Sequence, residues 1–109
     1  MYARINASTI ILIETRLSWD EAKRQANLRK HGLDFADADV VLESRYRLDV
    51  AVMRNGEIRV QSFSYVLNRL EVLTVVHLDR AGTQRVISYR PASEQESEIY
   101  YDWIGQEVD

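Results

Sequence analysis

The sequence has no cysteine, one proline and four glycines in 109 residues. Without cysteine the chain can form no disulfide, no thiolate zinc site and no cysteine nucleophile. The glycines are never clustered and no Gly-x-Ser-x-Gly segment is present, so the nucleotide-binding loops and the hydrolase serine turn are excluded. We therefore expect no cofactor. Apolar runs reach only four residues, as at Ile10–Ile13, far short of a membrane-spanning helix.

What remains is the composition of an ordinary globular domain, with 46% hydrophobic and 28% charged residues. A chain of this length buries enough surface to fold without a disulfide or a metal. We expect one domain over residues 1–109. No signal peptide is readable at the N-terminus, so we expect a cytoplasmic protein with no membrane association.

Charge is unevenly distributed along the chain. The net charge is −3, but six acidic and no basic residues follow Ser93, so residues 1–92 carry +3. Twelve of the 14 basic residues are arginine, which suits bidentate contacts with phosphate or carboxylate. The composition is compatible with an anion-binding surface or with a solvated, arginine-rich surface.

Three segments carry helix signals. A capping box, Ser18 to Glu21, predicts a helix that runs to about His31 and is closed by Gly32. Asp34 predicts a second short helix to about residue 43. A second capping box, Ser93 to Glu96, begins the last helix. The core face of the second helix is predicted to comprise Phe35, Ala38, Val41 and Leu42.

Alternating and β-branched segments predict strands over residues 8–16, 46–52, 58–65, 70–78 and 84–90. Asn55-Gly56 predicts a tight hairpin. A change of phase in the third of these strands predicts a bulge near Gln61-Ser62. The fold class is therefore α+β, with an antiparallel sheet of about four to five strands packed against helices.

The sequence contains no pattern typical of a metal-binding site. The two histidines, His31 and His77, have no metal-ligand spacing, and three acids at Asp34, Asp37 and Asp39 fit a helix start better than a calcium loop. We expect no metal site.

A set of cationic and acid–base residues remains, comprising Lys30, His31, Arg59, His77, Arg85 and Arg90. Such a set suits metal-free cleavage of RNA by its own 2′-hydroxyl, which needs a base, an acid and cations around the phosphate. Strict alternation would place Arg85 and Arg90 on opposite faces of their strand.

Each residue of the set also has a structural interpretation. Lys30-His31 before Gly32 is a favourable end for a helix. A histidine in a central strand, such as His77, is commonly a hydrogen-bonded core residue. Arg59 could pair with Asp49 or Glu57. Trp19 and Phe35 are interpreted as core.

Two long segments resemble the BrnT family. The first runs from Trp19-Asp20-Glu21-Ala22-Lys23 through Asn27 and Lys30-His31-Gly32 to Phe35 and Ala38; the second is Arg85-Val86-Ile87-Ser88-Tyr89-Arg90-Pro91-Ala92-Ser93. Val75-Val76-His77 matches a shorter family segment. The resemblance covers residues 17 to about 100.

The resemblance implies a ribonuclease toxin of a type II toxin–antitoxin pair, with a RelE-like fold. It also implies a ribbon-helix-helix antitoxin, BrnA, with which the toxin represses its operon and so contacts operator DNA indirectly. RNA, expected to be mRNA, is the implied substrate. The implied catalytic residues are His31, Lys30, Arg85 and Arg59, and the candidate substrate-binding residues are Arg90, Ser88 and Lys23.

The chain also departs from the family pattern. Residues 1–14 form an N-terminal extension, Gln61-Ser62-Phe63 replaces a segment containing glycine, and the final helix is acidic rather than basic. An alternative is therefore a catalytically inactive interaction module that only binds an antitoxin or transcriptional regulator.

Overall fold

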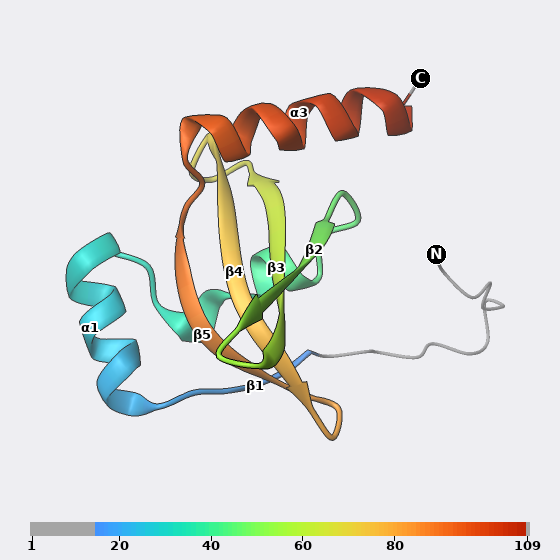
Figure 1. Cartoon of the computed structure of the whole chain (residues 1–109). Coiled ribbons are helices and arrows are strands. Elements are labelled where there is room, and N and C mark those ends of the chain that lie inside the picture. Colours follow the sequence, from blue (N-terminus) through green and yellow to red (C-terminus); the bar gives the residue numbers. More distant parts are fainter. Residues whose placement is uncertain (1–14, 109) are drawn as a thin grey trace, which may run out of the picture.

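The structure, a computed structural model, describes residues 15–108 and contains one five-stranded sheet with helices (Figure 1). The strands are β1 (Arg16–Ser18), β2 (Leu48–Arg54), β3 (Glu57–Val66), β4 (Glu71–Arg80) and β5 (Thr83–Pro91). The helices are α1 (Glu21–His31), the 3-10 turn η1 (Phe35–Asp37), α2 (Asp39–Leu42) and α3 (Glu94–Val108). The predicted α+β class is confirmed.

The strand order is β1-β5-β4-β3-β2, and every pair is antiparallel except β1 with β5. Most of the strand predicted over residues 8–16 lies outside the described residues, and β1 begins only at Arg16. The part of the chain from residue 15 to 108 contains no helix long and apolar enough to cross a membrane.

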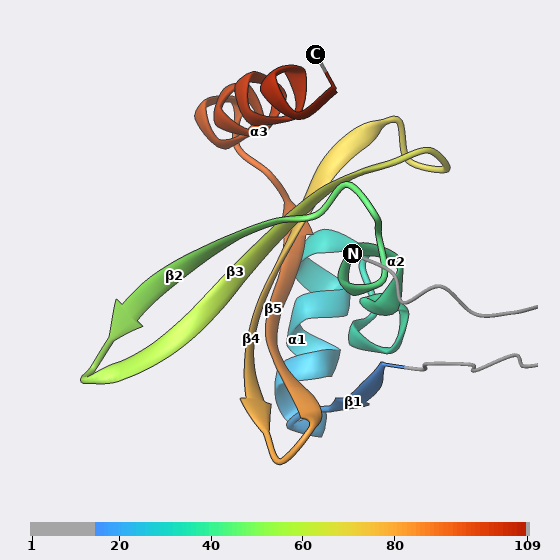
Figure 2. The ribbon, with the colours of Figure 1, turned by 90° about the vertical axis from the view of Figure 1, so that its right-hand side faces the viewer.

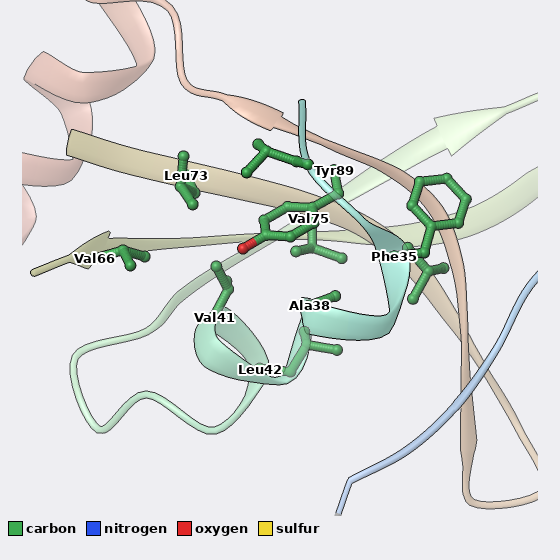
Figure 3. Packing of buried hydrophobic residues seen from close by; sticks show 10 residues of the cluster. Phe35, Ala38, Val41, Leu42, Val66, Leu73, Val75 and Tyr89 are labelled. Carbon is green, nitrogen blue, oxygen red and sulfur yellow. The ribbon is translucent and has the colours of Figure 1, made fainter. Parts of the chain in front are cut away.

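Helices α1 and α2 lie on one side of the sheet, whereas α3 crosses the end of the sheet where β3 finishes (Figure 2). The main core lies between the sheet and the segment η1–α2. Phe35, Ala38 and Val41 are completely buried there against Leu73 and Val75 of β4 (Figure 3). The predicted core face of the second helix is confirmed, although a 3-10 turn and a four-residue helix replace the continuous helix.

The start of α1 differs from the prediction. Asp20, not Ser18, is the N-cap, and its carboxylate accepts a 3.0 Å hydrogen bond from the Lys23 amide. Ser18 belongs to β1, where it pairs with Arg85. The carboxylate of Glu21 instead accepts from the Trp19 indole. Gly32 ends the helix with φ 69°, as predicted, because a left-handed cap favours glycine.

The hairpin at Asn55-Gly56 is confirmed, and both residues have positive φ. The bulge near Gln61-Ser62 is wrong, because β3 pairs without interruption with both of its neighbours. The apolar residues of β3 switch from one face of the sheet to the other at this point, because α3 begins to cover the face opposite the main core. Phe63 packs on that face against Tyr100 of α3.

Candidate functional site

Strand β5 contains a bulge that decides which side chains share a face. Its pairing with β4 shifts by one residue between Val76 and His77, which leaves Ile87 without a directly opposite partner. Val86 and Tyr89 consequently both point into the main core although they are three residues apart. An extra residue in one strand reverses the alternation beyond it.

Because of this bulge, Arg85, Ser88 and Arg90 lie on the same face. They stand opposite Leu78, Val76 and Thr74, which alternate regularly along β4. The expectation from strict alternation, that Arg85 and Arg90 lie on opposite faces, is therefore wrong. This face is the one partly covered by α3, and we refer to it as the arginine face.

Strand β3 adds two more polar side chains to the arginine face. Gln61 stands opposite Val76, and Arg59 is two residues earlier on β3. A shallow pocket of about 440 Å³ opens here; its lining includes the side chains of Arg54, Arg59, Gln61, Ser88 and Arg90. Three cations and two hydrogen-bonding groups in one depression form a site suited to an anionic ligand.

Arg90 is held by a carboxylate from α3. Its guanidinium makes two parallel contacts with Glu96, at 2.8 and 3.0 Å. Glu96 also accepts a 3.0 Å hydrogen bond from the side-chain amide of Gln61 and a 2.8 Å hydrogen bond from the backbone amide of Ser93. These hydrogen bonds, led by that of Arg90, lower the pKa of Glu96 to about 2. The Glu96 carboxylate therefore already occupies both terminal nitrogens of the Arg90 guanidinium, where a phosphate would otherwise bind.

The other arginines of this face are less engaged. Arg59 contacts Glu57 at 3.1 Å, which is one of the two structural alternatives expected for it. No described carboxylate lies within ion-pair distance of Arg85 or Arg54. Both guanidinium groups are thus available to an external anion.

The end of α1 is fixed beside the C-terminal part of β5. The Asn27 side chain donates to the Tyr89 carbonyl at 2.7 Å and accepts from the Tyr89 amide at 3.2 Å. It also donates to the Leu33 carbonyl. These bonds hold the last turn of α1, with Lys30 and His31, next to the segment that carries Arg90.

His31 is partly exposed and its pKa is lowered below 6.5, first by desolvation and then by the positive charges of Lys30 and Arg90. The imidazole is therefore mostly neutral at pH 7 and able to accept a proton. His31 does not line the pocket, and neither do Lys30, Lys23 or Arg85. The structure thus gathers Arg59, Ser88 and Arg90 in one pocket, whereas His31 lies outside its lining but close enough to Arg90 for that charge to lower the His31 pKa.

His77 lies on the opposite face and is a core residue, as its structural interpretation predicted. It is 3% exposed, and its ring nitrogens are 2.7 Å from the Ser62 hydroxyl and from the Gln84 side chain. Burial lowers its pKa. Since Ser62 also donates to Asp49, these residues form a closed structural network. In residues 15–108 no three side chains of the metal-binding types lie close enough together to hold an ion.

The family model for the BrnT ribonuclease toxin of type II toxin–antitoxin systems matches residues 19–96. The chain belongs to the BrnT family. A search of the curated proteins found no match.

The BrnT match begins at Trp19 and ends at Glu96, so it contains every candidate residue of the arginine face. Two pocket residues, Arg54 and Gln61, were not predicted from the sequence, and neither was Glu96, which contacts the pocket residues Gln61 and Arg90. The sequence assigned Glu96 only to a capping box. That capping box is confirmed, because the backbone amide of Glu96 also donates to the Ser93 hydroxyl at 3.1 Å. The same alternation that places Arg59 on this face could have identified Gln61.

Proposed function

We propose that this BrnT protein is a metal-independent endoribonuclease that cuts RNA on its arginine face. The observation that carries the proposal is the bulge at Ile87, which brings Arg85, Ser88 and Arg90 to the face of Arg59. RNA carries one phosphate per nucleotide, and guanidinium groups bind phosphate through paired, charge-assisted hydrogen bonds. Membership of a family of ribonuclease toxins supports RNA as the substrate.

In the proposed reaction, the ribose 2′-oxygen attacks the adjacent phosphorus and the bond from phosphorus to the 5′-oxygen breaks. One product ends in a 2′,3′-cyclic phosphate and the other begins with a 5′-hydroxyl. His31 takes the proton of the 2′-hydroxyl, because its lowered pKa keeps it neutral near pH 7. The departing 5′-oxygen is protonated by solvent.

The cations stabilise the charge that develops on the phosphate. We assign Lys30 and Arg85 to this role, since both are free of described carboxylates. Arg59 and Arg90 position neighbouring phosphates, with Ser88 and Lys23 as further substrate contacts. A phosphate that binds Arg90 must displace the carboxylate of Glu96.

The biological role follows from the same proposal. Cleavage of mRNA inhibits translation in the cytoplasm, and a ribbon-helix-helix antitoxin of the BrnA kind neutralises the toxin. Operator DNA is then reached only through that antitoxin. The membership of a type II toxin–antitoxin family supports the existence of the antitoxin partner.

The test is incubation of the purified chain with a long RNA in EDTA, beside the His31→Ala variant. The proposal expects cleavage by the wild type, products with cyclic phosphate ends, and a loss of about 10²-fold or more in the variant. Arg29→Ala, an exposed cation in the same helical turn, is the matched control and keeps its activity. Equal cleavage by His31→Ala would remove His31 from the mechanism.

A second candidate function is a catalytically inactive interaction module. The observation that favours it is the occupation of Arg90 by Glu96, which an acidic segment of a partner would mimic. Induced expression in bacterial cells separates the two functions. Growth arrest by the wild type but not by the Lys30/His31 double variant supports the nuclease, and equal growth of both strains supports the module.

A further inference from the structure

A second depression, on the other flank of α3 from the Arg90–Glu96 pair, has a different chemical character. It is a groove of about 660 Å³ between α3, the segment after α2 and the end of β3. We call it the α3 groove. Apolar and aromatic side chains dominate its lining, including Val40, Tyr46, Leu67, Tyr101 and Ile104.

These side chains are unusually accessible for their type. Leu67 is 78% exposed, Tyr101 49%, Tyr46 46% and Val40 44%. Leu70, in the same turn as Leu67, is 75% exposed. A continuous apolar surface of this kind on a folded domain typically marks a protein–protein contact.

The polar groups of the groove do not favour a small ligand. Apart from tyrosine hydroxyls, Ser44 and Asn68 supply the polar side chains of the lining. The Tyr100 hydroxyl is already used, because it donates to the Tyr46 carbonyl at 2.7 Å. Small-molecule sites place several convergent polar groups that fix the orientation of the ligand, and the α3 groove lacks such a set.

A row of negative charge runs along the exposed side of α3 and meets the groove at Tyr101. Glu98 is three residues before Tyr101 on α3 and therefore neighbours it on the helix surface, and Glu94 and Asp102 continue the row at four-residue spacing. All three are exposed, and no described basic side chain pairs with them. Eight residues of helix make the row about 12 Å long. Phosphate groups would be repelled here, whereas a basic helix would be attracted.

We propose that the α3 groove binds an amphipathic helix of the antitoxin, with apolar residues in the groove and Lys or Arg along its flank facing Glu94, Glu98 and Asp102. Apolar side chains at i, i+3 or i+4 and i+7 are the usual way in which a helix enters such a groove. A four-residue spacing of basic residues would match the acidic row. The inference rests on the proposed toxin function, because that function supplies the partner. According to this inference, the antitoxin and RNA bind different surfaces, namely the α3 groove and the arginine face.

The test measures binding of the antitoxin paired with this toxin by isothermal titration calorimetry. Leu67→Asp places a charge in the groove, and Glu98→Lys reverses one charge of the acidic row. Both side chains are exposed, and circular dichroism checks that the fold is kept. We expect each variant to weaken binding about tenfold or more. The matched control is Ile58→Asp, because Ile58 is 65% exposed on the β2–β3 hairpin, and its affinity should stay within about twofold.

Other results would overturn the inference. Weakened binding in Arg59→Ala, with unchanged binding in Leu67→Asp and Glu98→Lys, would place the antitoxin on the arginine face. A dimer of the chain alone in analytical ultracentrifugation, lost in Leu67→Asp, would assign the groove to a second copy. Absence of binding to the wild type would also refute it.

RNA cleavage is measured on the same variants, which keeps the two proposals separate. Leu67→Asp and Glu98→Lys are expected to cleave RNA like the wild type. An inactive wild type whose antitoxin binding still maps to the α3 groove would refute the nuclease and keep the docking surface.

Discussion

Arg90 of β5 and Glu96 of α3 form a bidentate ion pair, with contacts of 2.8 and 3.0 Å, at the end of the arginine face next to α3. The pair links the helix that follows the sheet to the pocket on the sheet. It also places a carboxylate where a substrate phosphate would bind. Among the α3 acids with described side chains, only Glu96 has this position; the exposed row of Glu94, Glu98 and Asp102 lies on another flank.

The first prediction concerns competition at Arg90. Glu96→Gln removes the negative charge from the fork of Arg90 while keeping an oxygen for the capping box. We expect affinity for a 2′-O-methyl RNA, which cannot be cleaved, to rise about threefold to tenfold in fluorescence anisotropy. Glu98→Gln removes the same charge from the far flank and is the control. An equal rise in both variants would show a general charge effect instead.

The second prediction concerns stability in acid. The folded state lowers the pKa of Glu96 from 4.5 to about 2, so the ion pair stabilises the fold fully above pH 4.5. This stabilisation is lost as the pH falls from about 4.5 to about 2. Both side chains are about a quarter to a third exposed and water screens the pair. We therefore expect a loss of about 1 to 2 kcal/mol in the free energy of unfolding.

Denaturant titrations of the wild type and Glu96→Gln at a series of pH values measure this loss. The difference between the two proteins should shrink toward pH 2. A difference that stays constant from pH 6 to pH 2 would contradict the assigned ionisation.

The third prediction concerns the pH dependence of cleavage. A base must be neutral to act, and the pKa of His31 is lowered below 6.5. The value of kcat/KM should therefore rise with pH, reach half of its plateau below pH 6.5 and stay high above it. The rise should be absent in the residual activity of His31→Ala. A rate that instead falls through this range would assign His31 the role of acid.

The fourth prediction concerns the contribution of Arg85 to RNA binding. Each phosphate neutralised on single-stranded nucleic acid contributes about −0.7 to the slope of log affinity against log salt. Arg85→Ala should reduce the magnitude of that slope by about 0.7. Arg45→Ala is the control, because Arg45 stacks on Tyr46 beside the α3 groove. An unchanged slope for Arg85→Ala would show that Arg85 contacts no phosphate.

Local signals predicted much of this fold. Asn55-Gly56 turns the chain because both residues tolerate positive φ, and Gly32 ends α1 for the same reason. The capping box at Ser93 is equally local. The N-cap of α1 was assigned two residues too early, because Ser18 and Asp20 are both good caps and pairing of Ser18 with β5 decides between them.

The arrangement of the site could not be predicted in the same way. Strict alternation separates Arg85 from Arg90, and the bulge that unites them depends on how β5 pairs with β4. The pairing of Glu96 with Arg90 depends on the path of α3 across the sheet. Both features are tertiary, and no repeat or spacing in the sequence encodes them.

The most direct test of the account is to map where RNA binds. An NMR titration of the labelled chain with a 2′-O-methyl RNA would follow the backbone amides. We predict shifts at Arg59, Gln61, Ser88 and Arg90, with little change at Ser62 and His77 on the opposite face. Shifts confined to that opposite face or to the α3 groove would contradict the assignment of the arginine face as the RNA-cleaving site.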